Sequence, residues 1–361
     1  MSLFSFAKNL AARFHKPRRK QVVFSGLALL LAVGGWFGYK LYADVAKLTR
    51  QSNPIKLVKS FTPSTLKETN GRINVLLAGY SADDTGHAGA ELTDSIMILS
   101  INLTTKQAEI ISVPRDLYVE IPGYGYSKIN AAYEYGQSEN FSESGYASGG
   151  MGLLEKVIET NLGVHSNYYA LINYTAFKDA VNAVDGVTVD IESTDARGLY
   201  DSNTGIKLSN GSNTLDGTAA LALARSRGDG AYEYGFPQGD FNRTQNQQLI
   251  LMALKDKLSD TSIIANPLKI GSLADALGDN VKTDMTIGEI ETFYQKVKGI
   301  SDSNMNSVTL NSVDGQNLLT DYTTANGQSA LIPKAGVDNF TDIQSAISSL
   351  LQANNSASST N

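Results

Sequence analysis

"INVLLAGYSADDTGHAGAELTDSIMILSINLTTKQAEIISV", residues 73–113, decides the fold of this chain. The stretch contains three runs rich in Ile, Val and Leu that are separated by turn-forming residues, and such runs predict β-strands. The predicted strands cover residues 73–79, 94–102 and 107–113. Because only the turn Leu-Thr-Thr-Lys separates the second strand from the third, these two strands are predicted to be antiparallel.

The ends of these strands bring candidate site residues to one edge of the sheet. If the first strand also runs antiparallel to the second, the end of the first, the start of the second and the end of the third share that edge. The loop 81–84, Asp94 and Arg115 then lie side by side. Asp94, with Asp83 or Asp84, would offer Mg²⁺ carboxylate oxygens while a phosphate completes the coordination. The alternatives are a solvated carboxylate at Asp94 and an ordinary Pro-Arg-Asp turn at Arg115.

Helical patterns alternate with short strands after residue 113. The predicted helices cover residues 150–162, 175–184, 215–225 and 241–258, and the predicted strands cover residues 168–172 and 186–191. This alternation predicts an α/β fold in which helices cover a central mixed β-sheet in α-β-α layers. Residues 263–351 mix helix and strand signals, and the chain ends in the polar tail QANNSASSTN.

The N-terminus has the pattern of a membrane anchor. Six basic residues in the first twenty precede an uncharged apolar run of eighteen residues from Val22 to Tyr39. That length is at the lower end of what a transmembrane helix needs, and Trp36 and Tyr39 lie where an interfacial aromatic belt is expected. A secretory signal peptide is the alternative, but its apolar region is usually shorter and ends at a small-residue cleavage site. The excess of positive charge before the run predicts a cytoplasmic N-terminus and an extracellular remainder.

Charge and composition exclude several classes of protein. Residues 1–50 carry nine Lys or Arg and one acid, for a net charge of +8. Because the whole chain has a net charge of −6, residues 51–361 carry a net charge of −14. A region this acidic is not expected to bind nucleic acid, and it would hold an anion only through a local basic cluster. The chain has no cysteine for a disulfide or a thiolate metal site. Its histidines, His15, His87 and His165, are too scattered for a metal site or a catalytic triad.

Three of the ten arginines lie within nineteen residues, at Arg225, Arg227 and Arg243. Arg225 and Arg227 end a predicted helix before Gly228, so they are also explained as cations at a helix C-terminus before a glycine cap. Arg243 lies in the first turn of the next predicted helix, with Asp240 as the expected N-cap. A cation opposes the helix dipole there unless an anion such as phosphate shares the helix N-terminus.

Arg243 also lies on the predicted inward stripe of its helix. The stripe contains Arg243, Gln247, Leu251, Leu254 and Leu258. Arginine at such a position favours an anion-binding site, because its guanidinium offers phosphate a bidentate contact. The alternative is a buried ion pair of Arg243 with Asp229, Glu233 or Asp240.

Six segments between residues 72 and 260 occur in a recognisable order. They are INVLLAG (73–79), TDSIMILSIN (93–102), SVPRDLYVEIPG (112–123) with SKINAAYEYG (127–136), YYALINYTAFKDAVNAVDGVTV (168–189), LDGTAALALARSR (215–227) and GDFNRTQNQQ (239–248). In this order and at this spacing, behind an N-terminal anchor, they resemble the LytR-CpsA-Psr proteins of bacterial envelopes.

The resemblance implies a membrane-anchored extracellular phosphotransferase. Such an enzyme moves an anionic glycopolymer, of teichoic acid or capsule type, from a polyprenyl pyrophosphate carrier to peptidoglycan. The implied cofactor is Mg²⁺, with Mn²⁺ as the alternative. By position, the metal-binding acid is Asp94, the pyrophosphate-binding residues are Arg115, Arg225, Arg227, Arg243 and Gln247, and the residues of the reacting centre are Arg115, Asp240 and Arg243.

The chain departs from the family pattern at three positions. Ser81 stands where an Asp is usual, Leu92 where Arg is common, and Asn246 where a second Arg is usual. The metal site is therefore predicted at Asp94 and Ser81, with Asp83 or Asp84 supplying the missing carboxylate. These departures favour, as the second hypothesis, a regulatory protein that binds polyprenyl pyrophosphate with little or no turnover. A transcriptional attenuator is disfavoured because about twenty cytoplasmic residues cannot form a helix-turn-helix domain.

The predicted organisation follows from these patterns. It comprises a cytoplasmic tail (1–21), a transmembrane anchor (22–42), an extracellular connector (43–71), a catalytic core (72–260), a C-terminal part of the same extracellular domain (261–350) and a disordered tail (351–361).

Overall fold

The computed structural model describes most of the chain beyond residue 63. The described residues are 64–81, 91–228, 230, 232–237, 239–259, 281–297, 300–311, 313 and 315–356. They all belong to one compact unit, Val45–Asn361. The predicted cytoplasmic tail and transmembrane helix, Asp83 and Asp84 lie outside the described residues. Within the described part of the chain, no helix combines the length and apolarity needed to span a bilayer.

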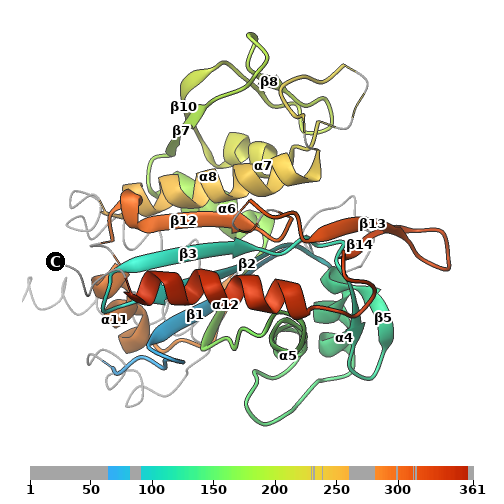
Figure 1. The fold of residues 1–361 in the computed structure, drawn as a ribbon. Coiled ribbons are helices and arrows are strands. Elements are labelled where there is room, and N and C mark those ends of the chain that lie inside the picture. The colour runs from blue at the N-terminus through green and yellow to red at the C-terminus, as the bar shows by residue number, and fades with distance from the viewer. Residues whose placement is uncertain are drawn as a thin grey trace, which may run out of the picture. The chain divides into compact units, whose positions relative to one another are not determined.

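A six-stranded mixed sheet forms the centre of this unit (Figure 1). Its strands, from one edge to the other, are β11 (Val281–Thr283), β6 (Tyr168–Ile172), β1 (Arg72–Tyr80), β2 (Thr93–Asn102), β3 (Gln107–Ser112) and β12 (Met305–Thr309). The pairs β11/β6, β1/β2 and β2/β3 are antiparallel, whereas β6/β1 and β3/β12 are parallel. The predicted strands and the predicted antiparallel order of the first three are confirmed.

Helices cover both faces of the sheet because the strand side chains alternate between two apolar surfaces. On one face, Leu76, Ile98 and Ile111 are fully buried in a core that also contains residues of three helices. These helices are α4 (Ala132–Ser138), α5 (Gly150–Leu162) and α12 (Thr341–Ser356). On the other face, Ile73 and Val75 pack with residues of α11 (Ile287–Val297). The predicted α-β-α layering is therefore confirmed.

A second, smaller core lies outside the central sheet. The predicted strand 186–191 forms β7 (Val187–Ile191), but β7 pairs with β10 (Gly211–Leu215) in a separate two-stranded sheet. Helices α6 (Tyr174–Ala183), α7 (Gly217–Arg225) and α8 (Asp240–Ser259) contribute residues to this core. Helix α8 also reaches the central sheet, because Gln248 donates a hydrogen bond to Ser112 at 2.6 Å.

Local capping explains where two of these helices begin. Asn173 caps α6 by accepting a hydrogen bond from the Ala176 backbone N–H at 2.8 Å, and Asp216 caps α7 through the Ala219 N–H at 2.8 Å. For this reason α7 begins at residue 217 and not at the predicted residue 215. The expected N-cap of α8, Asp240, is instead the first residue of that helix.

Two tyrosine-bearing hairpins complete the described unit at one end of the sheet. Strands β4 (Tyr118–Ile121) and β5 (Gly125–Lys128) form the first, and β13 (Leu319–Thr323) and β14 (Ser329–Pro333) form the second. Figure 1 shows β5 and β14 close together on the same side of the molecule as α4. The Leu331 N–H of β14 donates to the Asp116 carbonyl at 2.9 Å and so joins the second hairpin to the segment just before the first.

Gly136 allows α4 to pack closely against α5, and Gly136→Ala is expected to destabilise the protein. Alanine is the better helix former by about 1 kcal/mol. However, its Cβ would lie 2.6 Å from Leu153 Cβ and 2.9 Å from the Gly149 carbonyl oxygen. Overpacking of this kind costs about 1–3 kcal/mol, so the melting temperature should fall. Ser138→Ala, at the exposed end of the same helix, is the control; a higher melting temperature for Gly136→Ala would contradict the close packing.

Candidate functional site

The candidate site lies where β1 and β3 end and β2 begins. Tyr80 at the end of β1 pairs with Thr93 at the start of β2, and the Val113 N–H after β3 donates to the Ile96 carbonyl at 2.9 Å. Ser81 follows β1, Asp94 is the second residue of β2, and Arg115 lies three residues after β3. The predicted common edge for these residues is therefore confirmed.

Asp94 and Arg115 form an ion pair at this edge. Arg115 Nη1 lies 2.5 Å from Asp94 Oδ1, and the side chains are only 19% and 15% exposed. Arg115 Nε lies 3.5 Å from Asp116 Oδ2, and Lys128 Nζ lies 2.7 Å from Asp116 Oδ1. Two acids and two bases thus alternate along the edge, and each base is held in place by an acid.

Arg243 adds a further positive charge beside Asp116. It is 5% exposed in the first turn of α8. Burial alone would raise the pKa of Asp116, but the hydrogen bond from Lys128 and the charges of Arg115, Lys128 and Arg243 lower it below its ordinary value. The sequence patterns did not identify Asp116 or Lys128 as site residues. The only available signal for Asp116 was its position directly after Arg115.

The acids predicted as alternative partners of Arg243 have different surroundings. Glu233 accepts hydrogen bonds from the backbone N–H groups of Ser202 and Gly230, at 2.9 and 2.6 Å. Asp229 and the side chain of Asp240 lie outside the described residues. The predicted inward stripe of α8 is only partly correct, because Ile250 and Ala253 are its buried apolar residues and Leu251 is half-buried.

Gln247 connects the sheet edge to the end of α7. Its amide nitrogen donates to the Ala224 carbonyl at 3.1 Å, and its amide oxygen accepts from Ser95 Oγ at 2.9 Å. Asn246, one of the departures from the family pattern, makes longer contacts with the Leu223 carbonyl and Ser226 Oγ, at 3.4 and 3.3 Å. The end of α7 and the start of β2 are thereby held against the first two turns of α8.

Arg225 and Arg227 flank this junction. Arg225 is exposed at the last position of α7, and its guanidinium lies 4.8 Å from the centroid of the Tyr174 ring. Arg227 is half-buried, and its backbone N–H donates to Asp201 at 2.7 Å. The residue that caps α7 is Ser226 in an extended conformation, so the expected glycine cap at Gly228 is wrong. Asp201 binds the N–H of Gly228 as well, at 3.0 Å.

The described part of the predicted metal site consists of Asp94 and Ser81. Ser81 is fully buried, and its hydroxyl has no hydrogen-bond partner among the described residues. A buried hydroxyl without a hydrogen-bond partner, next to the strand that carries Asp94, is suited to be an oxygen ligand of a cation. No group of three His, Cys, Asp or Glu side chains is assembled for a metal within the described ranges, which omit Asp83 and Asp84. The metal site stays a prediction.

The fold and this arginine-bearing edge place the chain in a known family. Residues 36–337 match the LytR_cpsA_psr family, so the chain belongs to it. Over 313 residues it is 31% identical to TagU of Oceanobacillus iheyensis, named a polyisoprenyl-teichoic acid–peptidoglycan teichoic acid transferase, covering 83% of this chain and 87% of TagU. It is 30% identical over 245 residues to the regulatory protein MsrR of Staphylococcus aureus (strain COL), covering 67% of this chain and 63% of the length of MsrR.

A solved structure of TagT bound to LI-WTA has the same fold. It superimposes with a TM-score of 0.58 at 25% sequence identity, and the match covers 80% of this chain and 94% of that one.

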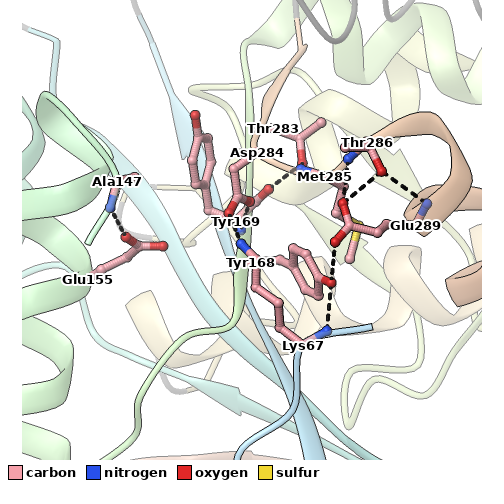
Figure 2. Close-up of polar contacts among 10 residues, drawn as sticks. All are labelled: Lys67, Ala147, Glu155, Tyr168, Tyr169, Thr283, Asp284, Met285, Thr286 and Glu289. Carbon is pink, nitrogen blue, oxygen red and sulfur yellow. Dashed lines mark hydrogen bonds and ion pairs between the residues drawn. The ribbon is translucent and has the colours of Figure 1, made fainter. Parts of the chain in front are cut away.

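A polar cavity of about 490 Å³ lies at the opposite end of the sheet. It is lined by residues that precede β1 and β6, by the loop before α5, and by Glu155 and Asp284. Glu155 accepts a hydrogen bond from the Ala147 N–H at 3.0 Å, and Asp284 accepts one from the Tyr169 N–H at 2.9 Å (Figure 2). Burial, together with the nearby charge of Asp284 and against the opposing effect of the Ala147 hydrogen bond, raises the pKa of Glu155 to about 7.

Glu155 is expected to make the protein less stable as pH rises from about 4.5 to 7. Because its pKa is raised on folding, the folded state holds the proton across this range and the unfolded state releases it. The loss is on the order of 3 kcal/mol for a shift of this size. Glu155→Gln should flatten the pH dependence of the melting temperature while keeping an acceptor for Ala147. Glu68→Gln, an exposed residue of the same cavity, is the control, and an unchanged slope in Glu155→Gln would contradict the assignment.

Proposed function

We propose that this chain transfers an anionic glycopolymer, of teichoic acid or capsule type, from a polyprenyl pyrophosphate carrier to peptidoglycan. The observation that carries the proposal is the convergence of Arg115, Arg243 and Gln247 with Asp94 at one edge of the sheet. The name of TagU and the LI-WTA bound to TagT support the choice of substrate. An edge lined by arginines suits the dense negative charge of a pyrophosphate.

The proposed reaction is a displacement at phosphorus. A sugar hydroxyl of peptidoglycan forms a new P–O bond to the polymer phosphate, the bridging P–O bond of the pyrophosphate breaks, and polyprenyl phosphate leaves. The hydroxyl proton is released to solvent or to a carboxylate of the site. Such a reaction needs in-line positioning and stabilisation of the charge on the departing phosphate, and no nucleophile from the protein.

The arrangement of the charged side chains assigns their roles in this proposal. Arg115 and Arg243 bind the pyrophosphate, and Arg225 and Arg227 bind it from the end of α7. Asp116 holds Arg115 in position before the substrate arrives, through the contact of 3.5 Å between Asp116 Oδ2 and Arg115 Nε. Lys128 in turn holds Asp116, through the contact of 2.7 Å between Lys128 Nζ and Asp116 Oδ1. Gln247 orients the start of β2 against α8 and offers its amide to a phosphate oxygen. Preorganised charges of this kind stabilise a transition state without rearranging during the reaction.

The proposed cofactor is Mg²⁺, with Mn²⁺ as the alternative. Asp94 and Ser81 would hold it, with Asp83 or Asp84 as the further carboxylate. When bound, a divalent cation supplies positive charge to the pyrophosphate oxygens. Asp94 keeps one carboxylate oxygen on Arg115, so it would present the other to the metal.

The proposed location is the outer face of the cell membrane. The apolar run within residues 22–42 and the basic residues before it support a single anchor with a cytoplasmic N-terminus. An anchored domain stays within reach of a lipid-linked substrate in the same membrane.

A regulatory protein that binds the same lipid with little turnover is the second candidate. The resemblance to MsrR, which is named a regulatory protein, favours it. Ser81 and Asn246 also favour it, because the family usually has a carboxylate at the first position and a guanidinium at the second. Transfer of polymer to peptidoglycan by the purified protein with Mg²⁺ would exclude this candidate.

Arg243→Ala is expected to weaken binding of a polyprenyl pyrophosphate lipid by about tenfold to a hundredfold. The reason is the loss of a charge-assisted phosphate contact, about 1.5–3 kcal/mol. Arg243→Lys should recover only part of the affinity, because the ammonium retains the charge but loses the bidentate geometry. The measurement is lipid binding by the detergent-solubilised full-length protein. Arg197→Ala, which removes an exposed arginine paired with Asp195, is the matched control.

The melting temperature of ligand-free Arg243→Ala distinguishes a binding role from a structural one. A binding role predicts that the lipid affinity falls far more than the stability does, since Asp116, the acid beside Arg243, keeps its contacts with Arg115 and Lys128 in the variant. A strongly destabilised variant whose lipid affinity falls only in proportion would show that Arg243 is structural.

Asp94→Ala is expected to weaken Mg²⁺ binding measured by calorimetry. Ser81→Asp, which restores the usual carboxylate, should strengthen it, since added ligand charge favours a divalent cation. If Asp83→Ala and Asp84→Ala both bind like the parent, the metal depends on Asp94 and phosphate alone. Equal Mg²⁺ affinity for Asp94→Ala and the parent would contradict the metal site.

A further inference from the structure

Three tyrosine rings from the two hairpins next to the site contact one another in a row. In β4 and β5, Tyr118 pairs with Lys128 and Glu120 pairs with Tyr126, so these four side chains share one face of the hairpin. The rings of Tyr118 and Tyr126 are stacked with centroids 5.7 Å apart, and the centroid of the Tyr322 ring of β13 lies 5.6 Å from that of Tyr118. We call Tyr118, Tyr126 and Tyr322 the tyrosine surface.

The core holds the tyrosine surface outward in a fixed orientation. The opposite face of the hairpin contains Val119 and Ile121, which are both fully buried. Tyr126 is 45% exposed, so its ring is accessible to solvent. Stacked rings that face solvent in a fixed orientation are characteristic of a binding surface, because their side chains lose little conformational entropy when a ligand covers them.

The tyrosine surface leads directly into the proposed site. Lys128 lies across from Tyr118 on the same face and pairs with Asp116, which in turn contacts Arg115. A chain molecule lying along the rings would therefore reach the arginines without turning away from the protein. This continuity indicates that the surface serves one of the two polymers in the proposed reaction.

Charge distinguishes between the two polymers. Asp321 lies on the face of β13 opposite Tyr322, so the exposed charged residues that remain on these hairpins and the segment after them are two acids, Glu120 and Asp338, and one base, Lys334. Lys128, on the same face as the rings, is already paired with Asp116. An anionic glycopolymer would meet like charge along this surface, which disfavours it. A strand of N-acetylated sugars has no such penalty, and it offers C–H faces to the rings and hydroxyls to the carboxylates.

We propose that the tyrosine surface binds the glycan strand of peptidoglycan and presents it as the acceptor, an assignment that rests on the proposed transferase function. Tyr118, Tyr126 and Tyr322 supply the stacking faces, and Asp338 and Glu120 accept hydrogen bonds from sugar hydroxyls. The anionic donor polymer enters from another side of the arginine cluster.

The test is co-sedimentation of the full-length protein in detergent with insoluble peptidoglycan freed of attached polymers. The double variant Tyr126→Ala/Tyr322→Ala should lose about tenfold in affinity, as expected for two lost stacking contacts. The pair Tyr126→Phe/Tyr322→Phe keeps the rings and should retain most of the binding, which separates stacking from misfolding. Tyr232→Ala removes a tyrosine that is 86% exposed elsewhere and should bind like the parent.

Three outcomes would overturn the inference. The first is that Tyr126→Ala/Tyr322→Ala co-sediments with peptidoglycan as well as the parent does. The second is that this double variant and Tyr232→Ala lose peptidoglycan binding to the same extent. The third is that the double variant keeps its binding to peptidoglycan and loses binding to soluble anionic polymer. Arg115→Ala separates this inference from the proposed function, because it should abolish transfer while still sedimenting with peptidoglycan. If the parent protein shows no transfer but its sedimentation still depends on the tyrosines, the proposed transferase function would be rejected and glycan binding by the tyrosine surface would be retained.

Discussion

The antiparallel register of β1, β2 and β3 is the constraint on which the site depends. Tyr80 pairs with Thr93, and the chain continues from these two residues into Ser81 and Asp94. A slip of one residue would turn Leu76 and Ile98 away from the core that buries them, so hydrophobic burial on both faces of the sheet enforces the register. The same burial therefore positions the charged residues, although none of them contributes to the apolar core.

Electrostatics explains how an acidic domain can prepare a site for an anion. Burying an arginine is unfavourable unless an acid or hydrogen bonds compensate its charge. Asp94 and Asp116 provide this compensation for Arg115, and Asp116 also lies near Lys128 and Arg243. A pyrophosphate would meet cations whose orientations are already set, while the −14 net charge beyond residue 50 discourages adventitious anions elsewhere.

The departures from the family pattern have unequal structural consequences. Asn246 bridges α7 and α8 through the Leu223 carbonyl and Ser226, so this position has acquired a structural contact in place of a charge. Ser81 leaves a buried hydroxyl without a partner among the described residues, so that position retains capacity for a ligand. The tyrosine surface lies next to the arginines, on the hairpin whose Lys128 pairs with Asp116.

The sequence by itself determined five of the strands, four of the helices and the common edge of Ser81, Asp94 and Arg115, because alternating and helical apolar periodicity are local signals. It also identified Arg225, Arg227 and Arg243 as candidates. Only the tertiary structure decided that Lys128 pairs with Asp116, that β7 pairs with β10, and that Tyr322 joins Tyr118. These contacts join residues that lie far apart in the chain or on facing strands. Their partners depend on how the layers pack, and no local pattern of residues encodes that.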